Sequence, residues 1–244
     1  MKVCADKIDQ ADKLFKDESY VKAQTTLEEM MEGCHGSGYM ERAQFLLAET
    51  RYKEEDWVEA RGEYTTFVLN FPSSPFAETA SFRKALSSYR MSYSDMRDDS
   101  PTQTAVRDFD EFVSNYPSSG LLDSAHHYQD SLTNRLGEKD FQTARLYSRM
   151  EEPLASAMYL KTFLNQYPTS PRQLEASLMI IDDYIILEQF DPAQFYLDRL
   201  AQMFPQAKSE HASLTSKLSS AKNDFEARVK DELKEKKYRK EDAK

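Results

Sequence analysis

Apolar residues recur along this chain at spacings of three and four, which is the period of a helix that buries one face. The clearest stripes are Phe45, Ala48 and Tyr52, and Leu174, Leu178, Ile181 and Ile185. Extended over the whole chain, the pattern predicts helices that pair into hairpins. The predicted pairs are 4–17 with 20–32, 39–54 with 57–70, 75–92 with 102–115, 120–149 with 153–166, and 171–188 with 191–203.

One further helix is predicted at about 207–237, with Leu214, Leu218, Ala221, Phe225 and Leu233 on one face. The last repeat of a stacked array exposes its apolar side unless something covers it. We therefore predict a repeat domain over residues 1–206, followed by a capping helix and charged tail over residues 207–244.

A short phrase marks the corners between the predicted hairpins. Residues 70–75, 115–120 and 166–171 each hold an aromatic residue, a proline and then small hydroxyl residues. Proline cannot continue a helix, and serine or threonine is a preferred cap for the next one. We therefore expect each phrase to end one hairpin and to cap the first helix of the following hairpin.

A second phrase lies inside the hairpins: an aromatic residue, two variable residues and an alanine. It occurs at Tyr20 to Ala23, Trp57 to Ala60 and Phe190 to Ala193. The alanine lets two helices approach closely, and the combination resembles the tetratricopeptide repeat. The expected fold is therefore all-α, a tetratricopeptide-like α-solenoid of about five helical hairpins with a C-terminal capping helix.

Composition agrees with a helical fold and excludes several functional classes. The chain has 12 Val and Ile residues against 44 Ala and Leu, and only 6 glycines in 244 residues, which disfavours sheets and glycine-rich phosphate loops. Its net charge of −10 disfavours nucleic acid as a partner, although residues 222–244 are lysine-rich. No apolar run is long enough to span a membrane.

No motif indicates catalysis, a cofactor or a metal. The chain lacks the phosphate-loop, zinc-protease and nucleophile-elbow patterns. His126 and His127 point about 100° apart on a helix, and Cys34 with His35 has no second pair of ligands. The two cysteines, Cys4 and Cys34, form neither a disulfide framework nor a Cys-x-x-Cys pair. We therefore expect a protein that is not an enzyme, with no cofactor.

Helical-hairpin solenoids bind extended peptides in a groove lined by the first helix of each hairpin. Tyr39, Tyr52, Tyr89 and Arg90 have the right position in the repeat to line such a groove. Each of these residues also fits a role in helix packing. They are the candidate peptide-binding residues.

Residues 98–113, followed by the corner at 115–119, resemble the BamD family of tetratricopeptide-type lipoproteins in the outer-membrane β-barrel assembly machinery. The family shows an acidic run, then Ala-x-x-x-Phe-x-x-Phe, then Tyr-Pro-x-Ser. Residues 136–147 match its next helix in part. One departure is Tyr159, where the family usually carries arginine.

The resemblance implies a non-enzymatic protein, lipid-anchored at the periplasmic face of the outer membrane, although no leader is visible in the sequence. Its expected partners are the periplasmic domains of a BamA-type barrel protein, other subunits of the complex, and unfolded β-barrel precursor peptides, with Tyr39 as a precursor contact. Cys4 is the candidate acylated residue. The alternative is another periplasmic tetratricopeptide adaptor or an envelope or cell-division scaffold.

Overall fold

A computed structural model describes residues 2–93 and 98–241, with side chains described for residues 3–93 and 98–236. These residues hold eleven helices and no strand, so the predicted all-α fold of tetratricopeptide-like hairpins is confirmed. The helices are α1 (Lys2–Lys16), α2 (Tyr20–Gly33), α3 (Met40–Lys53), α4 (Trp57–Asn70), α5 (Ala77–Met91), α6 (Ser100–Asn115), α7 (Leu122–Arg149), α8 (Pro153–Gln166), α9 (Gln173–Ile186), α10 (Phe190–Met203) and α11 (Lys208–Glu241).

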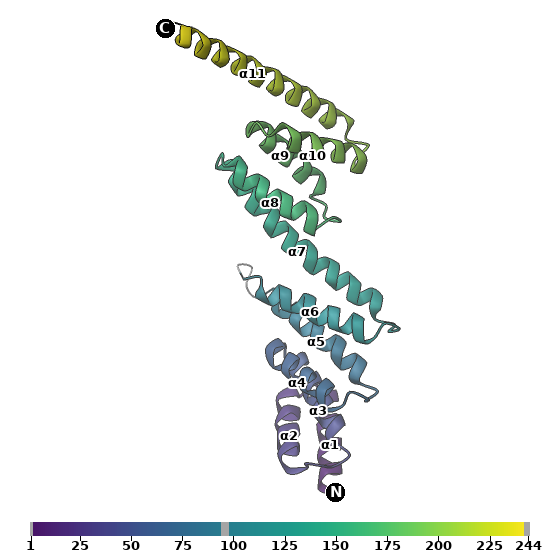
Figure 1. Ribbon diagram of the computed structural model, residues 1–244. Coiled ribbons are helices and arrows are strands. Elements are labelled where there is room, and N and C mark those ends of the chain that lie inside the picture. The colour runs from purple at the N-terminus through teal and green to yellow at the C-terminus, as the bar shows by residue number, and fades with distance from the viewer. Residues whose placement is uncertain (1, 94–97, 242–244) are drawn as a thin grey trace. The chain divides into compact units, whose positions relative to one another are not determined.

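The helices group into two compact units, residues 1–133 and 134–244, with the boundary inside α7. Within unit 1, α1 packs on α2, α3 on α4, and α5 on α6, and neighbouring hairpins also touch (Figure 1). Within unit 2, α8 to α11 pack in chain order. Consecutive helices are therefore neighbours, as the short connections between them require.

Alanine is the residue that lets these helices pack closely. Ala23, Ala60 and Ala193 of the second phrase are fully buried, and so is the alanine that follows each corner, at Ala80, Ala125 and Ala176. A methyl side chain fills little space, so two helix backbones approach at these positions. Their burial agrees with the predicted role of alanine in close helix packing.

The turn inside each of four hairpins places a glutamate in the left-handed backbone region. These residues are Glu18, Glu55, Glu151 and Glu188, with φ of 56°, 62°, 58° and 57°. The amide of the following residue donates to a carbonyl five residues back, as Asp56 does to Arg51 at 3.1 Å. This is the Schellman ending of a helix, whose left-handed position is usually occupied by glycine. Because glutamate and not glycine occupies this position, the sequence does not indicate these turns.

The corner serines do not cap the following helix, contrary to the prediction. Ser74 Oγ accepts a hydrogen bond from the amide of Phe76 at 3.0 Å, and α5 begins only at Ala77. Ser119 and Ser170 accept in the same way from Leu121 and Arg172. Each serine therefore forms a tight turn ahead of the helix, because the hydroxyl reaches the amide two residues on before helical geometry starts.

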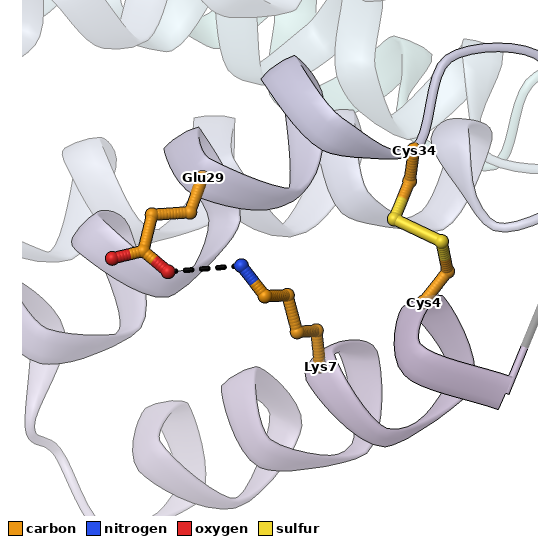
Figure 2. The surroundings of a disulfide bond; sticks show 4 residues. All are labelled: Cys4, Lys7, Glu29 and Cys34. Atoms are coloured by element: carbon orange, nitrogen blue, oxygen red, sulfur yellow. Dashed lines mark hydrogen bonds and ion pairs between the residues drawn. A yellow bond between two sulfur atoms is a disulfide. The ribbon is translucent and has the colours of Figure 1, made fainter.

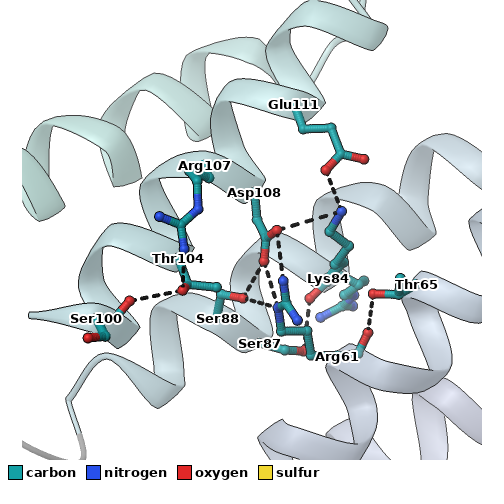
Figure 3. Close-up of polar contacts among 11 residues, drawn as sticks. Arg61, Thr65, Lys84, Ser87, Ser88, Ser100, Thr104, Arg107, Asp108 and Glu111 are labelled. Atoms are coloured by element: carbon teal, nitrogen blue, oxygen red, sulfur yellow. Dashed lines mark hydrogen bonds and ion pairs between the residues drawn. The ribbon is translucent and has the colours of Figure 1, made fainter.

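A buried ion network joins three helices of unit 1 (Figure 3). Asp108 of α6 accepts hydrogen bonds from Arg61 Nε of α4 at 2.8 Å and from Ser88 Oγ of α5 at 2.5 Å. Lys84 of α5 lies 3.6 Å from Asp108 and 2.6 Å from Glu111. The Asp108 side chain is 6% exposed, so its charge depends on these partners instead of water.

In unit 2, the first half of α11 covers the α9–α10 hairpin. Leu214 and Leu218 are buried in the core of this unit, and Phe225 meets Phe190 edge to face at 5.6 Å. The predicted covering face is therefore correct as far as Phe225. It is wrong for Leu233, which is 61% exposed.

Candidate functional site

The first candidate site is a cluster of aromatic and arginine side chains in unit 1. The rings of Tyr52 and Trp57 lie 5.0 Å apart. The guanidinium carbon of Arg83 lies 4.8 Å from the centre of the Tyr52 ring, and that of Arg90 lies 5.7 Å from the centre of the Trp57 ring. Two of the predicted groove residues, Tyr52 and Arg90, therefore share one cluster through Trp57, which the sequence pattern had assigned only to a hairpin turn. We define Tyr52, Trp57, Arg83 and Arg90 as the Trp57 cluster.

The two arginines of this cluster differ in their partners. Glu49 accepts a hydrogen bond from the Tyr64 hydroxyl at 2.6 Å and lies 3.5 Å from Arg83. Burial is the largest single influence on Arg83 and lowers its pKa, but Glu49, Tyr64 and Tyr52 together outweigh burial, and the pKa is raised. Arg90 is exposed and has no carboxylate partner among the described residues. Its charge is therefore the one that a ligand's carboxylate would meet.

The other two predicted groove residues lie elsewhere in unit 1. The Tyr89 ring packs against Tyr128 at 4.7 Å, and its hydroxyl lies 2.7 Å from that of Tyr93. Tyr39 is 38% exposed at the residue before α3, outside the Trp57 cluster. Tyr52 and Tyr89 both pack against the buried cluster around Phe82 and Phe109, and Tyr39 is not part of that cluster.

The second candidate site is an exposed apolar surface on the α7–α8 hairpin of unit 2. Five large apolar side chains that follow one another closely in sequence are exposed: Leu146, Met150, Leu154, Met158 and Tyr159. Met158 is 65% exposed. Single exposed apolar residues are common on proteins, whereas several that adjoin one another are typical of a contact surface.

A cavity of about 380 Å³ lies beside this surface. Ala155, Met158, Tyr159 and Thr162 line it from α8, and Asp140 and Tyr147 line it from α7. The rings of Tyr147 and Tyr159 stack 5.2 Å apart with 13° between their planes, which holds both in place. We define these six lining residues as the α7–α8 groove.

None of the residues predicted to line a groove lies in the α7–α8 groove. Helix periodicity assigns apolar residues to a buried face, so it does not distinguish the exposed Met158 and Leu154 from packing residues. Tyr159, noted in the sequence only as a departure from the BamD family pattern, is one of the residues that line this groove. An aromatic residue there gives the groove an apolar wall in place of a positive charge.

Behind the groove helix, Asp183 of α9 is buried against Ser156 of α8. Asp183 is 4% exposed and Ser156 is fully buried. Burial raises the pKa of Asp183 to about 6, and the neighbouring Asp182 adds to the effect, while the nearby Ser156 hydroxyl opposes it. The folded protein therefore holds the Asp183 proton more tightly than the unfolded chain does.

We expect Asp183→Asn to stabilise unit 2 at pH 8, by about 2–3 kcal/mol. Because the folded pKa lies above the unfolded value, the wild type loses stability as pH rises from about 4 to 6, and asparagine removes that loss. The gain should shrink steadily as pH falls towards 4. Hydrogen exchange of α8 and α9 amides at several pH values measures it. Asp198→Asn, at an exposed position on α10, is the control, and an equal, pH-independent effect of both variants would contradict the expectation.

Cys4, the candidate acylation residue, is bonded to Cys34 in a disulfide. A sulfur in a disulfide cannot also carry a lipid in a thioether, so the two roles exclude one another. No disulfide framework is predicted from the sequence, in which the two cysteines lie 30 positions apart. The hairpin fold brings the first turn of α1 beside the end of α2, which sequence spacing alone does not reveal.

Two further observations concern metals and membranes. Among the described side chains, no group of three or more His, Cys, Asp or Glu lies where it could hold a metal ion. Across the described residues, no helix is both long and apolar enough to cross a bilayer.

Residues 6–171 match the YfiO family model, described as an outer membrane lipoprotein. The chain belongs to this family. The matched residues run from α1 to the corner before α9, so they include the Trp57 cluster and the α7–α8 groove. The resemblance to the BamD family noted in the sequence is thereby confirmed.

Relatives with known names agree with the family assignment. The outer membrane protein assembly factor BamD of Rickettsia prowazekii is 21% identical over 173 residues, 71% of this chain and 69% of the relative. BamD of Caulobacter vibrioides is 22% identical over 151 residues, 62% of this chain and 50% of the relative. The chain therefore spans about half the length of the second relative.

Solved structures with similar helical hairpins include a tetratricopeptide-repeat protein of Thermus thermophilus and PilW, a type IV pilus biogenesis factor. The first has a TM-score of 0.37 at 16% identity and covers 88% of this chain and 98% of its own. PilW has a TM-score of 0.39 at 14% identity and covers 88% and 99%. The family assignment rests on the sequence match instead.

Proposed function

We propose that this protein is a non-enzymatic subunit of the outer-membrane β-barrel assembly machinery. It docks on the periplasmic domains of a BamA-type barrel protein through the α7–α8 groove, and it receives unfolded β-barrel precursors in unit 1. The observation that carries this proposal is the exposed apolar groove in a chain of the YfiO family. The relatives named as outer membrane protein assembly factors support the proposed role in outer-membrane assembly.

The groove has the features of a protein-docking site. It combines exposed apolar side chains with a stacked tyrosine pair that is already ordered, so little side-chain freedom is lost on binding. Its carboxylate, Asp140, accepts a hydrogen bond from the Tyr167 hydroxyl at 2.8 Å. Protein contacts are typically built from such an apolar centre with few polar groups.

The Trp57 cluster suits the other role, which is to bind an extended, aromatic-rich peptide. Tyr52 and Trp57 offer ring faces, and Arg90 offers a charge that no described carboxylate neutralises. Rings bind aromatic side chains of a peptide, and the guanidinium binds its carboxylate groups. Tyr39 remains a proposed contact of the same precursor.

We expect Met158→Glu to weaken binding to the periplasmic domains of a BamA-type protein by about tenfold or more, because a charge then enters the apolar contact. Isothermal titration calorimetry with the full chain measures the affinity. Met158 is exposed, so the fold should be unchanged by circular dichroism.

The matched control for Met158→Glu is Leu69→Glu, which places the same charge at an exposed apolar position on α4 of unit 1. We expect Leu69→Glu to leave the affinity for the BamA-type domains unchanged. Equal affinity of both variants and the wild type would show that the groove is not the docking site.

We expect Tyr39→Ala and Arg90→Ala each to weaken binding of a peptide with the terminal β-signal segment of a barrel precursor, by about two- to fivefold. Trp57 is the only tryptophan, and it lies under Arg90, so its fluorescence reports peptide binding directly. The exposed Arg107→Ala on α6 is the control for a general loss of positive charge. If either variant binds the peptide as tightly as the wild type, the residue replaced in that variant is not part of the binding site.

A further inference from the structure

A single disulfide ties the two ends of the first hairpin together (Figure 2). It joins Cys4, in the first turn of α1, to Cys34, the residue that ends α2, and their Cα atoms lie 6.0 Å apart. Beside it, Lys7 and Glu29 form an ion pair at 2.9 Å across the same two helices. The covalent bond and the ion pair therefore both act on the contact between α1 and α2.

Helix α1 covers an apolar face of α2 and α3. Ile8 and Ala11 of α1 are buried together with Leu27, Met30 and Leu47. Among the described residues, α1 packs on α2 and α3, and a helix with few packing partners detaches more easily than a central one. Without α1, these apolar side chains of α2 and α3 would face water.

The two sulfurs differ in access and in their electrostatic setting. Cys34 is 6% exposed and packs in the hairpin core, whereas Cys4 is only partly buried. Cys4 also lies at the positive end of a helix, which favours a thiolate, while Cys34 lies at the negative end of α2. In the reduced hairpin, Cys4 is therefore the thiol that meets a bulky reagent first.

We propose that the first hairpin is a substrate of a Cys-x-x-Cys thiol–disulfide oxidoreductase, with Cys4 as the entry sulfur and Cys34 as the resolving sulfur. The Cys4 thiolate attacks the oxidoreductase disulfide, which forms a mixed disulfide and releases one thiolate of the enzyme. The Cys34 thiolate then attacks Cys4 Sγ and releases the second. The hairpin loses two electrons and two protons, and the oxidoreductase becomes a dithiol. Oxidation thereby locks α1 over α2 and α3.

The order of the two sulfurs is tested with single-cysteine forms of the full chain and oxidised glutathione as the probe. Mass spectrometry follows adduct formation on Cys4 in Cys34→Ala and on Cys34 in Cys4→Ala. Under native conditions, Cys4 should react at least about tenfold faster, and in 8 M urea the two rates should converge. Equal native rates, or faster reaction of Cys34, would overturn the assignment of Cys4 as the entry sulfur.

A second experiment uses the wild-type chain and does not depend on the variants folding. The reduced chain is mixed with one equivalent of an oxidised Cys-x-x-Cys oxidoreductase, and the peptide joining Cys4 to Cys34 should appear in step with the enzyme's dithiol. Hydrogen exchange of α1 should slow on oxidation, while α8 and α9 stay unchanged. Absence of the joined peptide, or equal α1 exchange in both redox states, would overturn the proposal.

Discussion

Replacing Asp108 with alanine is expected to lower the free energy of unfolding of unit 1 by about 3–5 kcal/mol. Asp108 is the shared partner of Arg61, Lys84 and Ser88 (Figure 3). Lys84 would keep its ion pair with Glu111, but removal of the carboxylate leaves Arg61 and the buried Ser88 hydroxyl without their close acceptor, where water has little access. The loss is that desolvation cost in addition to the broken hydrogen bonds.

The Asp108→Ala effect is measured by urea unfolding followed through the fluorescence of Trp57, which reports on unit 1 alone because it is the only tryptophan. Asp110→Ala, two residues away on the exposed side of α6, is the matched control. It removes the same charge and should change stability by less than about 1 kcal/mol. A similar small effect of both variants would mean that the network does not hold α4, α5 and α6 together.

Removing the disulfide is the second large effect that we expect. The double variant Cys4→Ala, Cys34→Ala should lose about 3–4 kcal/mol of unit 1 stability, because the unfolded chain gains the freedom of a loop that spans 30 residues. The same urea experiment measures it, and the wild type in dithiothreitol should lose a similar amount.

The internal control is the thermal unfolding of α8 to α10, monitored by hydrogen exchange. It should be the same with and without the disulfide, because the disulfide lies wholly in unit 1. Unchanged stability of unit 1 in the double variant and in dithiothreitol would contradict a stabilising role for the bond.

Much of the fold was predictable because helical periodicity and corner chemistry are local properties. The boundaries of α4 and α8 were predicted to the residue, and the buried alanines followed from the aromatic-x-x-Ala phrase. The left-handed turns at Glu18, Glu55, Glu151 and Glu188 were not predictable, because glutamate carries no turn signal. The positions of the serine corners were predicted correctly, but the serine hydroxyls accept hydrogen bonds in the turn before the helix and do not cap the helix itself.

The candidate sites were less predictable because they depend on which helix faces meet. Tyr52 and Arg90 were identified from their place in the repeat, yet only the fold brings them together on Trp57. Met158 and Tyr147 are residue types that also occur in helix cores, so the sequence does not distinguish the two roles. The groove between α7 and α8 follows only from the three-dimensional packing of these helices. The pairing of Cys4 with Cys34 likewise depends on how the first hairpin closes.

The most direct test of the proposed role in barrel assembly is recovery of partners with the tagged full chain from detergent-solubilised cell envelopes. We expect mass spectrometry to identify a BamA-type barrel protein in the recovered material, in an amount that falls with Met158→Glu and not with Leu69→Glu. Recovery of no barrel protein by the wild-type chain would contradict the proposed function.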